Sequence, residues 1–322
     1  MNLRKVQEIG GTYLISIPKD WARRSGLTKG SIVAIVERED GCITVNPKYS
    51  LENNVETTTI HPSRFLEREI TGKYLLGFDI IKISGEPRLL PEIYERVRTN
   101  VRRLIGLEIV EEDANKIVLQ CLLEPSALPP ERIIRREHLL ASSMHRDVLT
   151  SLNESNAPLA TSIIERDEEV DRLYFLLVRL LRMIVLKPHL SVKLGLSMID
   201  CLDYRLMANY IEAIADYSQE VAMNVIQFSG TSLPKKVIQT LNKLGELAYK
   251  MHEDAFKAFL SKDLRLIEKV LEREQTSKNI IRELDEYLSG KSFEVISYAS
   301  SVASALTKIC DYCVDLADLV IP

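Results

Sequence analysis

The chain has 322 residues, of which 46% are hydrophobic and 27% are charged, and its formal net charge is -4. This length exceeds what a single hydrophobic core usually supports, so we expect a globular protein of about two or three domains. The longest apolar stretch, residues 173–186, is too short to span a bilayer and contains Arg179 and Arg182, which excludes a membrane-inserted protein.

Charge is distributed unevenly along the chain. Residues 1–29 carry six basic and two acidic side chains, a net charge of +4, so the remainder carries -8. This asymmetry indicates a basic module for a polyanion joined to an acidic body, with an unevenly charged solvated surface as the alternative. The first residues lack the features of a signal peptide and the five cysteines are scattered, so we expect a cytoplasmic protein with reduced thiols.

Residues 1–48 are predicted to form two short β-hairpins with a short helix between them. The first hairpin turns at Gly10-Gly11, because glycine accepts the positive φ of a tight turn, and the second turns at Asp40-Gly41. Residues 19–26 fit one or two helical turns ended by glycine. So short a segment cannot bury both faces of its strands, so we expect it to pair with a second copy of itself.

The order of these elements in "GGTYLISIPKDWARRSGLTKGSIVAIVEREDGCITVNP" resembles the AbrB/SpoVT-type swapped-hairpin domains. The resemblance implies a homodimer in which two chains interleave their hairpins and basic residues on the dimer face contact DNA. The residues at the matching positions are Arg4, Lys5, Lys19, Arg23 and Arg24. Their contacts to phosphates would be salt-dependent and largely independent of base sequence. The same fold also serves as a plain dimerisation module, which is the alternative.

Residues 55–124 are predicted to form a small α/β unit. Strands near residues 78–85 and 115–124 flank a helix, which ends before Gly106, and a short strand that follows it. We interpret the basic residues of this helix as its solvated face and assign them no chemistry; they are Arg96, Arg98, Arg102 and Arg103. The proline-rich residues 124–138 connect this unit to the rest of the chain.

From residue 131 onward the chain is predicted to be helical, with few glycines and periodic leucine, isoleucine and valine. The predicted helices are residues 131–153, 156–186, 191–228, 234–260, 263–288 and 291–321. Six helices joined by short turns favour an arrangement of two three-helix bundles. The expected fold class is therefore multidomain: a small swapped-hairpin β domain at residues 1–48, a small α/β unit at 55–124, and all-α tandem three-helix bundles at 131–322.

An internal repeat supports the division of the helices into two bundles. Residues 211–226 match residues 306–321 at six of sixteen positions without a gap, and residues 163–173 align with residues 270–280. The helix pattern, the duplication and the segment "IEAIADYSQEVA" together resemble the PhoU family, whose members are tandem three-helix bundles. The resemblance implies a protein that represses phosphate uptake by acting on the ATPase of a phosphate ABC transporter or on its sensor protein.

Resemblance to PhoU also implies metal ions held by Glu/Asp-x-x-x-Asp pairs. In the first repeat the matching residues are Asp167, Asp171, Glu212 and Asp216. In the second repeat the aligned residues are Glu274, Lys278, Thr307 and Asp311, so two of the four carboxylates are replaced. Carboxylates four residues apart share a helical face, and like charges so close repel unless a cation lies among them. We expect metal at the first repeat only, as Mg, Mn, Fe or Zn, with a solvated acidic face as the alternative.

Other candidate sites have less support. Cys310-x-x-Cys313 has a metal-like spacing without a second pair, and we interpret it as buried helical thiols. The sequence contains no Glu-x-x-His motif, no glycine-rich phosphate loop and no nucleophile elbow, which argues against an enzyme.

Three functional hypotheses remain. The first is a DNA-binding transcriptional regulator of phosphate uptake whose helical repeats sense phosphate status through metal or partner binding. The second is a regulator of a phosphate ABC transporter or its sensor that acts through protein contacts, with the β module only dimerising. The third is a metal-dependent enzyme built on the helical bundle.

Overall fold

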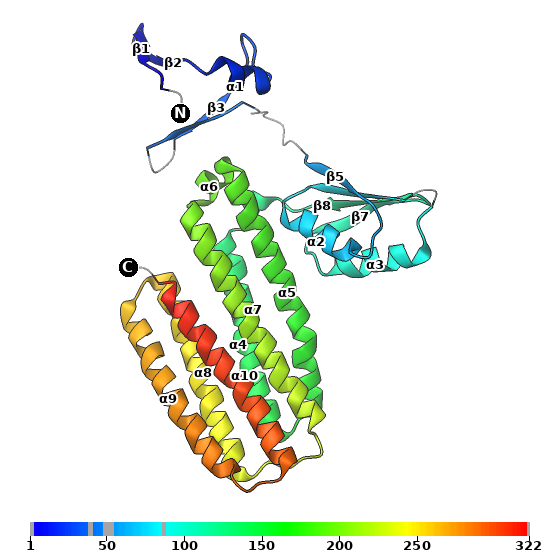
Figure 1. The fold of residues 1–322 in the computed structure, drawn as a ribbon, viewed down its shortest axis with the longest axis vertical. Coiled ribbons are helices and arrows are strands. Elements are labelled where there is room, and N and C mark those ends of the chain that lie inside the picture. Colours follow the sequence, from blue (N-terminus) through cyan, green and yellow to red (C-terminus); the bar gives the residue numbers. More distant parts are fainter. Residues whose placement is uncertain (1–2, 38–40, 48–54, 86–87, 321–322) are drawn as a thin grey trace. The chain divides into compact units, whose positions relative to one another are not determined.

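The computed structural model describes residues 3–37, 41–47, 55–85 and 88–320, and it divides into two compact units, Met1–Val55 and Glu56–Pro322 (Figure 1). Asp40 of the predicted Asp40-Gly41 turn and the end of the last predicted helix, residue 321, lie outside the described residues. Among the described residues no helix is both long and apolar enough to cross a membrane.

The first unit consists of two antiparallel hairpins and a short helix, as predicted. Its elements are β1 (Val6–Ile9), β2 (Thr12–Ile15), α1 (Lys19–Arg24), β3 (Ala34–Glu37) and β4 (Ile43–Asn46). Gly10 and Gly11 have φ values of 58° and 79°, which a two-residue turn between twisted strands requires. Pro18 precedes α1, and Gly26 follows it with a φ of 69°, so the helix stays short.

None of the described side chains in the first unit is buried. The apolar side chains of its strands that are between 60% and 72% exposed include Val6, Ile9, Tyr13, Ile15 and Ile35. Strands normally bury such side chains, and an exposed apolar surface of this kind marks a site of association. A single copy of the first unit therefore lacks a hydrophobic core.

The second unit begins with a four-stranded sheet in the order β5-β6-β8-β7, in which β5 is parallel to β6 and the other neighbours are antiparallel. Its elements are β5 (Thr57–Ile60), α2 (Leu66–Leu75), β6 (Ile80–Ser84), α3 (Pro91–Arg102), β7 (Leu107–Glu112) and β8 (Lys116–Cys121). Alternate residues such as Ile81, Ile83 and Leu119 are buried in one core with side chains of α2 and α3. Sequence analysis predicted β6, α3, β7 and β8 but missed β5 and α2.

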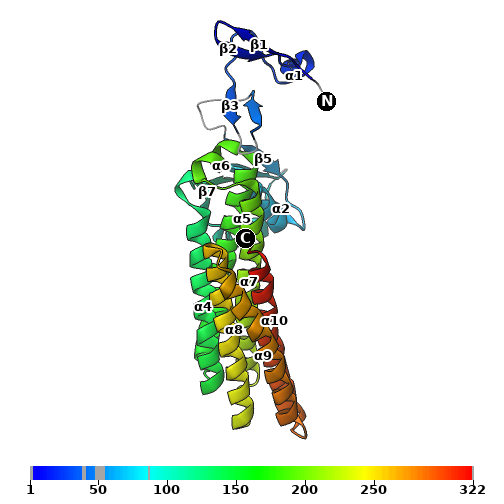
Figure 2. The ribbon, with the colours of Figure 1, turned by 90° about the vertical axis from the view of Figure 1, so that its left-hand side faces the viewer.

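The helical region forms two three-helix bundles, as predicted (Figure 2). A short 3-10 helix, η1 (Pro125–Ala127), precedes it. Its helices are α4 (Pro130–Glu154), α5 (Ala157–Leu186), α6 (Pro188–Leu194), α7 (Met198–Gln227), α8 (Lys235–Ser261), α9 (Leu264–Leu288) and α10 (Phe293–Asp318). Helices α4, α5 and α7 pack together, as do α8, α9 and α10, and contacts of α4 with α8 and of α7 with α10 join the two bundles.

The prediction of one helix over residues 191–228 is wrong, because the chain forms α6 and α7 there. Gly195 adopts a φ of 65° and ends α6. Ser197 then starts α7 with a capping box: its hydroxyl accepts from the Asp200 N–H at 3.1 Å, and the Asp200 carboxylate accepts from the Ser197 N–H at 2.8 Å.

Arg179 of α5 holds the α/β unit against the helices. This side chain is 2% exposed, and its guanidinium donates to the backbone carbonyls of Tyr74, Phe78 at 3.1 Å and Gly77 at 3.4 Å. Its guanidinium also lies 3.8 Å from a carboxylate oxygen of Asp79. A buried cation satisfied by carbonyls of another element fixes the position of that element. The sheet and its helices therefore lie beside α5, toward the end of the bundle that carries α6 (Figures 1 and 2).

Candidate metal centre and nucleic acid interface

Helices α5 and α7 pack side by side and present carboxylates to each other. One carboxylate oxygen from each of Asp171, Glu212 and Asp216 lies within 4.8 Å of the other two. Among the described residues this is the one group of three or more potential metal ligands. The structure thus brings together three of the four residues predicted for the first repeat.

Asp167, the fourth predicted residue, is buried beside this group of three. Its carboxylate accepts a hydrogen bond from Nε2 of Gln219 at 2.5 Å. Burial, followed by the charges of Asp216 and Asp171, raises the pKa of Asp167 to about 7. Asp167 therefore places a further carboxyl group next to the three, with its protonated form favoured. Sequence analysis missed Gln219, which holds Asp167 in place.

The carboxylates of this cluster repel one another. Burial and the charges of Asp216, Asp171 and Asp167 raise the pKa of Glu212 to about 7, an effect that Arg205 opposes. Burial and the charge of Asp171 also raise the pKa of Asp216. Both shifts have the sign expected where acidic groups are crowded in a partly dry site, and a bound cation would oppose both by favouring the ionised carboxylates.

Glu137 of α4 is a further acidic group that sequence analysis missed. Its side chain is fully buried, and neither carboxyl oxygen has a hydrogen-bond partner among the described residues. Burial, followed by the charge of Glu212, raises the pKa of Glu137 well above its usual range. An orphaned buried carboxyl beside three converging carboxylates fits a centre for a hard cation, because all the donors are oxygens. The absence of nitrogen and sulfur donors makes zinc the poorest of the predicted metals.

Arg103, at the C-terminal end of α3, reaches this cluster from the α/β unit. Its Nη2 lies 2.9 Å from Oδ2 of Asp171, and its guanidinium carbon lies 6.0 Å from the ring centroid of Phe175. Arg103 is exposed, as expected of a solvated face, but it also forms an ion pair with a distant helix that sequence analysis did not predict. Arg96 and Arg98 pair with glutamates of the α/β unit itself.

The second repeat arranges its charges differently. Lys278 pairs with Glu274 at 2.5 Å on α9, and Lys308 pairs with Asp311 at 3.1 Å on α10. The Thr307 hydroxyl donates to the backbone of its own helix at 2.7 Å. Each carboxylate of the aligned set thus has a lysine on its own helix. Metal at the first repeat only remains a prediction, and these lysines are its physical basis.

The basic residues predicted to contact DNA are all exposed in the first unit. Lys19 and Arg23 lie one helical turn apart on α1, with Arg24 beside them, and Arg4 and Lys5 immediately precede β1. In the part of the chain that the structure describes, none of the five takes part in an ion pair. Their charges are therefore available to an anionic partner.

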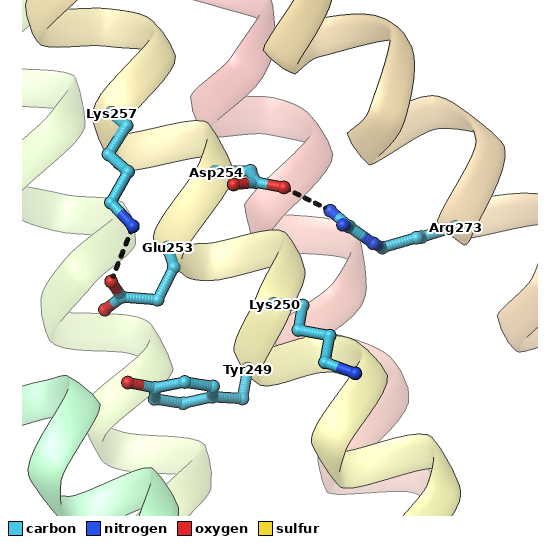
Figure 3. Close-up of a pocket in the computed structure, with 6 residues that line it drawn as sticks. All are labelled: Tyr249, Lys250, Glu253, Asp254, Lys257 and Arg273. Atoms are coloured by element: carbon cyan, nitrogen blue, oxygen red, sulfur yellow. Dashed lines mark hydrogen bonds and ion pairs between the residues drawn. The ribbon is translucent and has the colours of Figure 1, made fainter.

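Two further features take no part in either candidate site. Cys310 and Cys313 are buried, as predicted, and burial raises the pKa of both thiols, to about 12 for Cys310. A surface pocket of 270 Å³ between α8 and α9 is lined by Tyr249, Lys250, Glu253, Asp254, Lys257 and Arg273 (Figure 3). Its acidic groups are neutralised locally, because Lys257 pairs with Glu253 at 3.3 Å and Arg273 with Asp254 at 2.5 Å.

Comparison with known proteins gives matches to two family models. The model described as "PhoU domain" matches residues 134–225 and 241–320, one segment in each predicted repeat. The model described as "Antidote-toxin recognition MazE, bacterial antitoxin" matches residues 6–50, the segment predicted to be AbrB/SpoVT-like. No curated protein matches the chain.

Two solved structures share the helical fold. PhoU from Pseudomonas aeruginosa is similar with a TM-score of 0.54 and 19% identity, over 61% of this chain and 95% of that one. The phosphate transport system regulatory protein PhoU from Streptococcus pneumoniae is similar with a TM-score of 0.51 and 16% identity, over 59% of this chain and 91% of that one. At these identities the likeness concerns the fold of the tandem bundles.

Proposed function

Because the chain belongs to the PhoU family, we propose that it regulates phosphate uptake, and that it does so as a DNA-binding transcriptional regulator. In this proposal the tandem bundles sense phosphate status through a metal ion or a protein partner, and the first unit binds DNA. The description of the Streptococcus pneumoniae structure as a phosphate transport system regulatory protein supports the first part. The match of residues 6–50 to an antitoxin model supports a separate module at the opposite end of the chain from the bundles.

The DNA-binding proposal is carried by one observation, the exposure of both apolar and basic side chains in the first unit. The strands leave side chains such as Ile9 and Ile15 uncovered, and the cations of α1 have no acidic partner among the described residues. A second copy of the unit would cover the apolar surface and double the number of cations in one assembly. Clustered lysine and arginine side chains are what phosphate neutralisation requires.

The sensing part of the proposal places a cation at the first repeat. Asp171, Glu212 and Asp216 would hold it, and the carboxyl groups of Asp167 and Glu137 lie close to them. When bound, a divalent or trivalent ion such as Mg, Mn or Fe would neutralise these carboxylates and link α5 to α7. The stability of the bundle would then differ between the metal-bound and metal-free states. A partner that binds one of these states more tightly would respond to the metal.

A second candidate function has support from the same apolar surface. If the first unit only dimerises, the protein would act through contacts with a phosphate ABC transporter ATPase or with a sensor protein. The third hypothesis, a metal-dependent enzyme, gains nothing from the comparisons, because neither matching family description names an enzyme.

An electrophoretic mobility shift with genomic DNA fragments tests the proposal and separates it from the second candidate. We expect the full chain to bind, and deletion of residues 1–48 to abolish binding. Arg23→Ala combined with Arg24→Ala should weaken binding to every fragment and reduce its salt dependence, since each lost phosphate contact lowers the log-log slope by about 0.9. Arg135→Ala combined with Arg136→Ala, the adjacent arginines of α4, is the matched control and should change neither.

Equal binding by the truncated chain would refute the assignment of DNA binding to the first unit. A full chain that sediments as a dimer but shifts no fragment would favour the dimerisation-only alternative.

A further inference from the structure

The contact between Arg103 and Asp171 joins two modules with different roles. Arg103 follows α3 of the α/β unit, whereas Asp171 belongs to α5 and is one of the three carboxylates that converge at the first repeat. Of the three, Asp171 is the one that a guanidinium contacts directly in the described part of the chain. The same carboxylate is thus shared between a side chain of the α/β unit and the candidate metal centre.

We propose that Arg103 and a metal ion compete for Asp171, so that cation binding at the first repeat releases the C-terminal end of α3 from α5. This inference rests on the metal centre proposed above. It adds a consequence of metal binding outside the bundle, in a unit that the PhoU-domain match does not include.

Charge is the physical basis of the competition. Arg103 already supplies one positive charge, with its Nη2 2.9 Å from the Oδ2 atom of Asp171. A divalent ion bound among oxygens that lie within 4.8 Å of one another would be close to this guanidinium and would repel it. The ion carries more charge and would contact all three carboxylates, whereas Arg103 bonds to one of them. Arg103 is also 54% exposed, so it can turn to solvent at little cost.

The rest of the interface would hold when Arg103 leaves. The turn that follows α3 is fixed independently, because the Tyr74 hydroxyl donates to the Ile105 carbonyl at 2.9 Å and Leu104 is buried. The buried guanidinium of Arg179 in turn lies over the ring of Tyr74, with the guanidinium carbon 4.8 Å from the ring centroid. Release is therefore confined to the last turn of α3 and the residue that follows it, and a variant at Arg103 should still fold.

Manganese titration of the full chain by isothermal calorimetry tests the competition. Arg103→Gln removes the competing charge and is expected to tighten Mn²⁺ binding by about three- to tenfold, the range for a partly exposed charge at this distance. Arg102→Gln is the matched control: Arg102 is the adjacent arginine, is exposed and forms no ion pair among the described residues. It should leave the affinity within about twofold, because its charge has no direct contact with the site.

Hydrogen exchange gives a second readout that is independent of affinity. In the wild-type chain, saturating Mn²⁺ should speed exchange in the peptide that covers residues 98–104, and in Arg103→Gln the same peptide should exchange at one rate with and without Mn²⁺. Equal or weaker Mn²⁺ binding by Arg103→Gln, with normal binding by the wild type, would overturn the competition and leave the metal centre standing. Failure of both proteins to bind Mn²⁺ would refute the metal centre and the competition together.

Discussion

Mn²⁺ is expected to stabilise the helical unit through the first repeat, and Glu212→Ala combined with Asp216→Ala is expected to abolish this effect. Two like charges 4.8 Å apart, the upper limit of the distances between the converging oxygens, repel by about 0.9 kcal/mol at the dielectric constant of water and about 3.5 kcal/mol at an effective constant of 20. A dication among the three carboxylates replaces this repulsion with attraction, and it links α5 to α7 in the folded state only.

The size of the effect follows from mass action. At a free Mn²⁺ concentration about 100-fold above its Kd, binding to the folded state adds about 2.7 kcal/mol to the free energy of unfolding. For a unit of this size that corresponds to a rise in Tm of about 5 to 10 °C. Without metal, the double variant should be at least as stable as the wild type, because it lacks two of the repelling charges.

Differential scanning calorimetry of the full chain, with and without Mn²⁺, measures both effects. Glu274→Ala combined with Asp311→Ala removes the two carboxylates at the aligned positions of the second repeat and is the matched control. We expect it to keep the whole Mn²⁺ shift. A shift that survives in the first-repeat variant, or one that disappears in the second-repeat variant, would refute this account of the site.

Three further predictions follow from buried or exposed side chains. Arg179→Met removes the donor to three backbone carbonyls and should lower the free energy of unfolding, measured in urea, by about 3 to 5 kcal/mol. The same change at the exposed Arg182 should not lower it. A loss below about 1 kcal/mol for Arg179→Met would contradict the role of Arg179 in holding the α/β unit. Burial lowers the pKa of His145 to about 4, so the folded state resists protonation of this side chain. The free energy of unfolding should therefore fall as the pH drops from about 6.5 to about 4. His145 alone contributes up to about 1.4 kcal/mol per pH unit to this fall. His145→Gln should reduce the slope of the unfolding free energy against pH by the contribution of one proton. An unchanged slope would argue against the lowered pKa of His145. Ile15→Lys should convert the full chain from dimer to monomer in sedimentation velocity. Leu139→Lys, at a similarly exposed position on α4, should not. An unchanged mass for Ile15→Lys would refute dimerisation through the hairpins.

Local chemistry made much of the fold predictable from the sequence. Gly10-Gly11 specifies a tight hairpin turn, and the long helices follow from apolar residues at helical spacing. The elements that were missed have weak local signals: β5 is a short edge strand rich in threonine, and α2 begins after Phe65, whose side chain provides no cap. The break between α6 and α7 was missed because Gly195 stands inside an otherwise periodic stretch.

The candidate metal site also contains residues that the sequence predicts and residues that it does not. Asp171, Glu212 and Asp216 could be proposed from spacing and repetition, because an i, i+4 pair lies on one face of any helix. Glu137 and Arg103 could not, since they reach the site from α4 and from the end of α3 and carry no motif. Arg103 lies 68 residues from its partner Asp171, and only the docking of the α/β unit on α5 brings the two together.

The most direct test of the central proposal is occupancy of the genome by this protein in cells grown with high and with low phosphate. Chromatin immunoprecipitation is expected to place the full chain at promoters of phosphate-uptake genes, with occupancy that changes between the two conditions. A chain with Arg23→Ala and Arg24→Ala should lose this occupancy. Wild-type occupancy that does not respond to phosphate, or no enrichment at any promoter in either condition, would contradict the proposal that this PhoU-family protein regulates phosphate uptake through DNA.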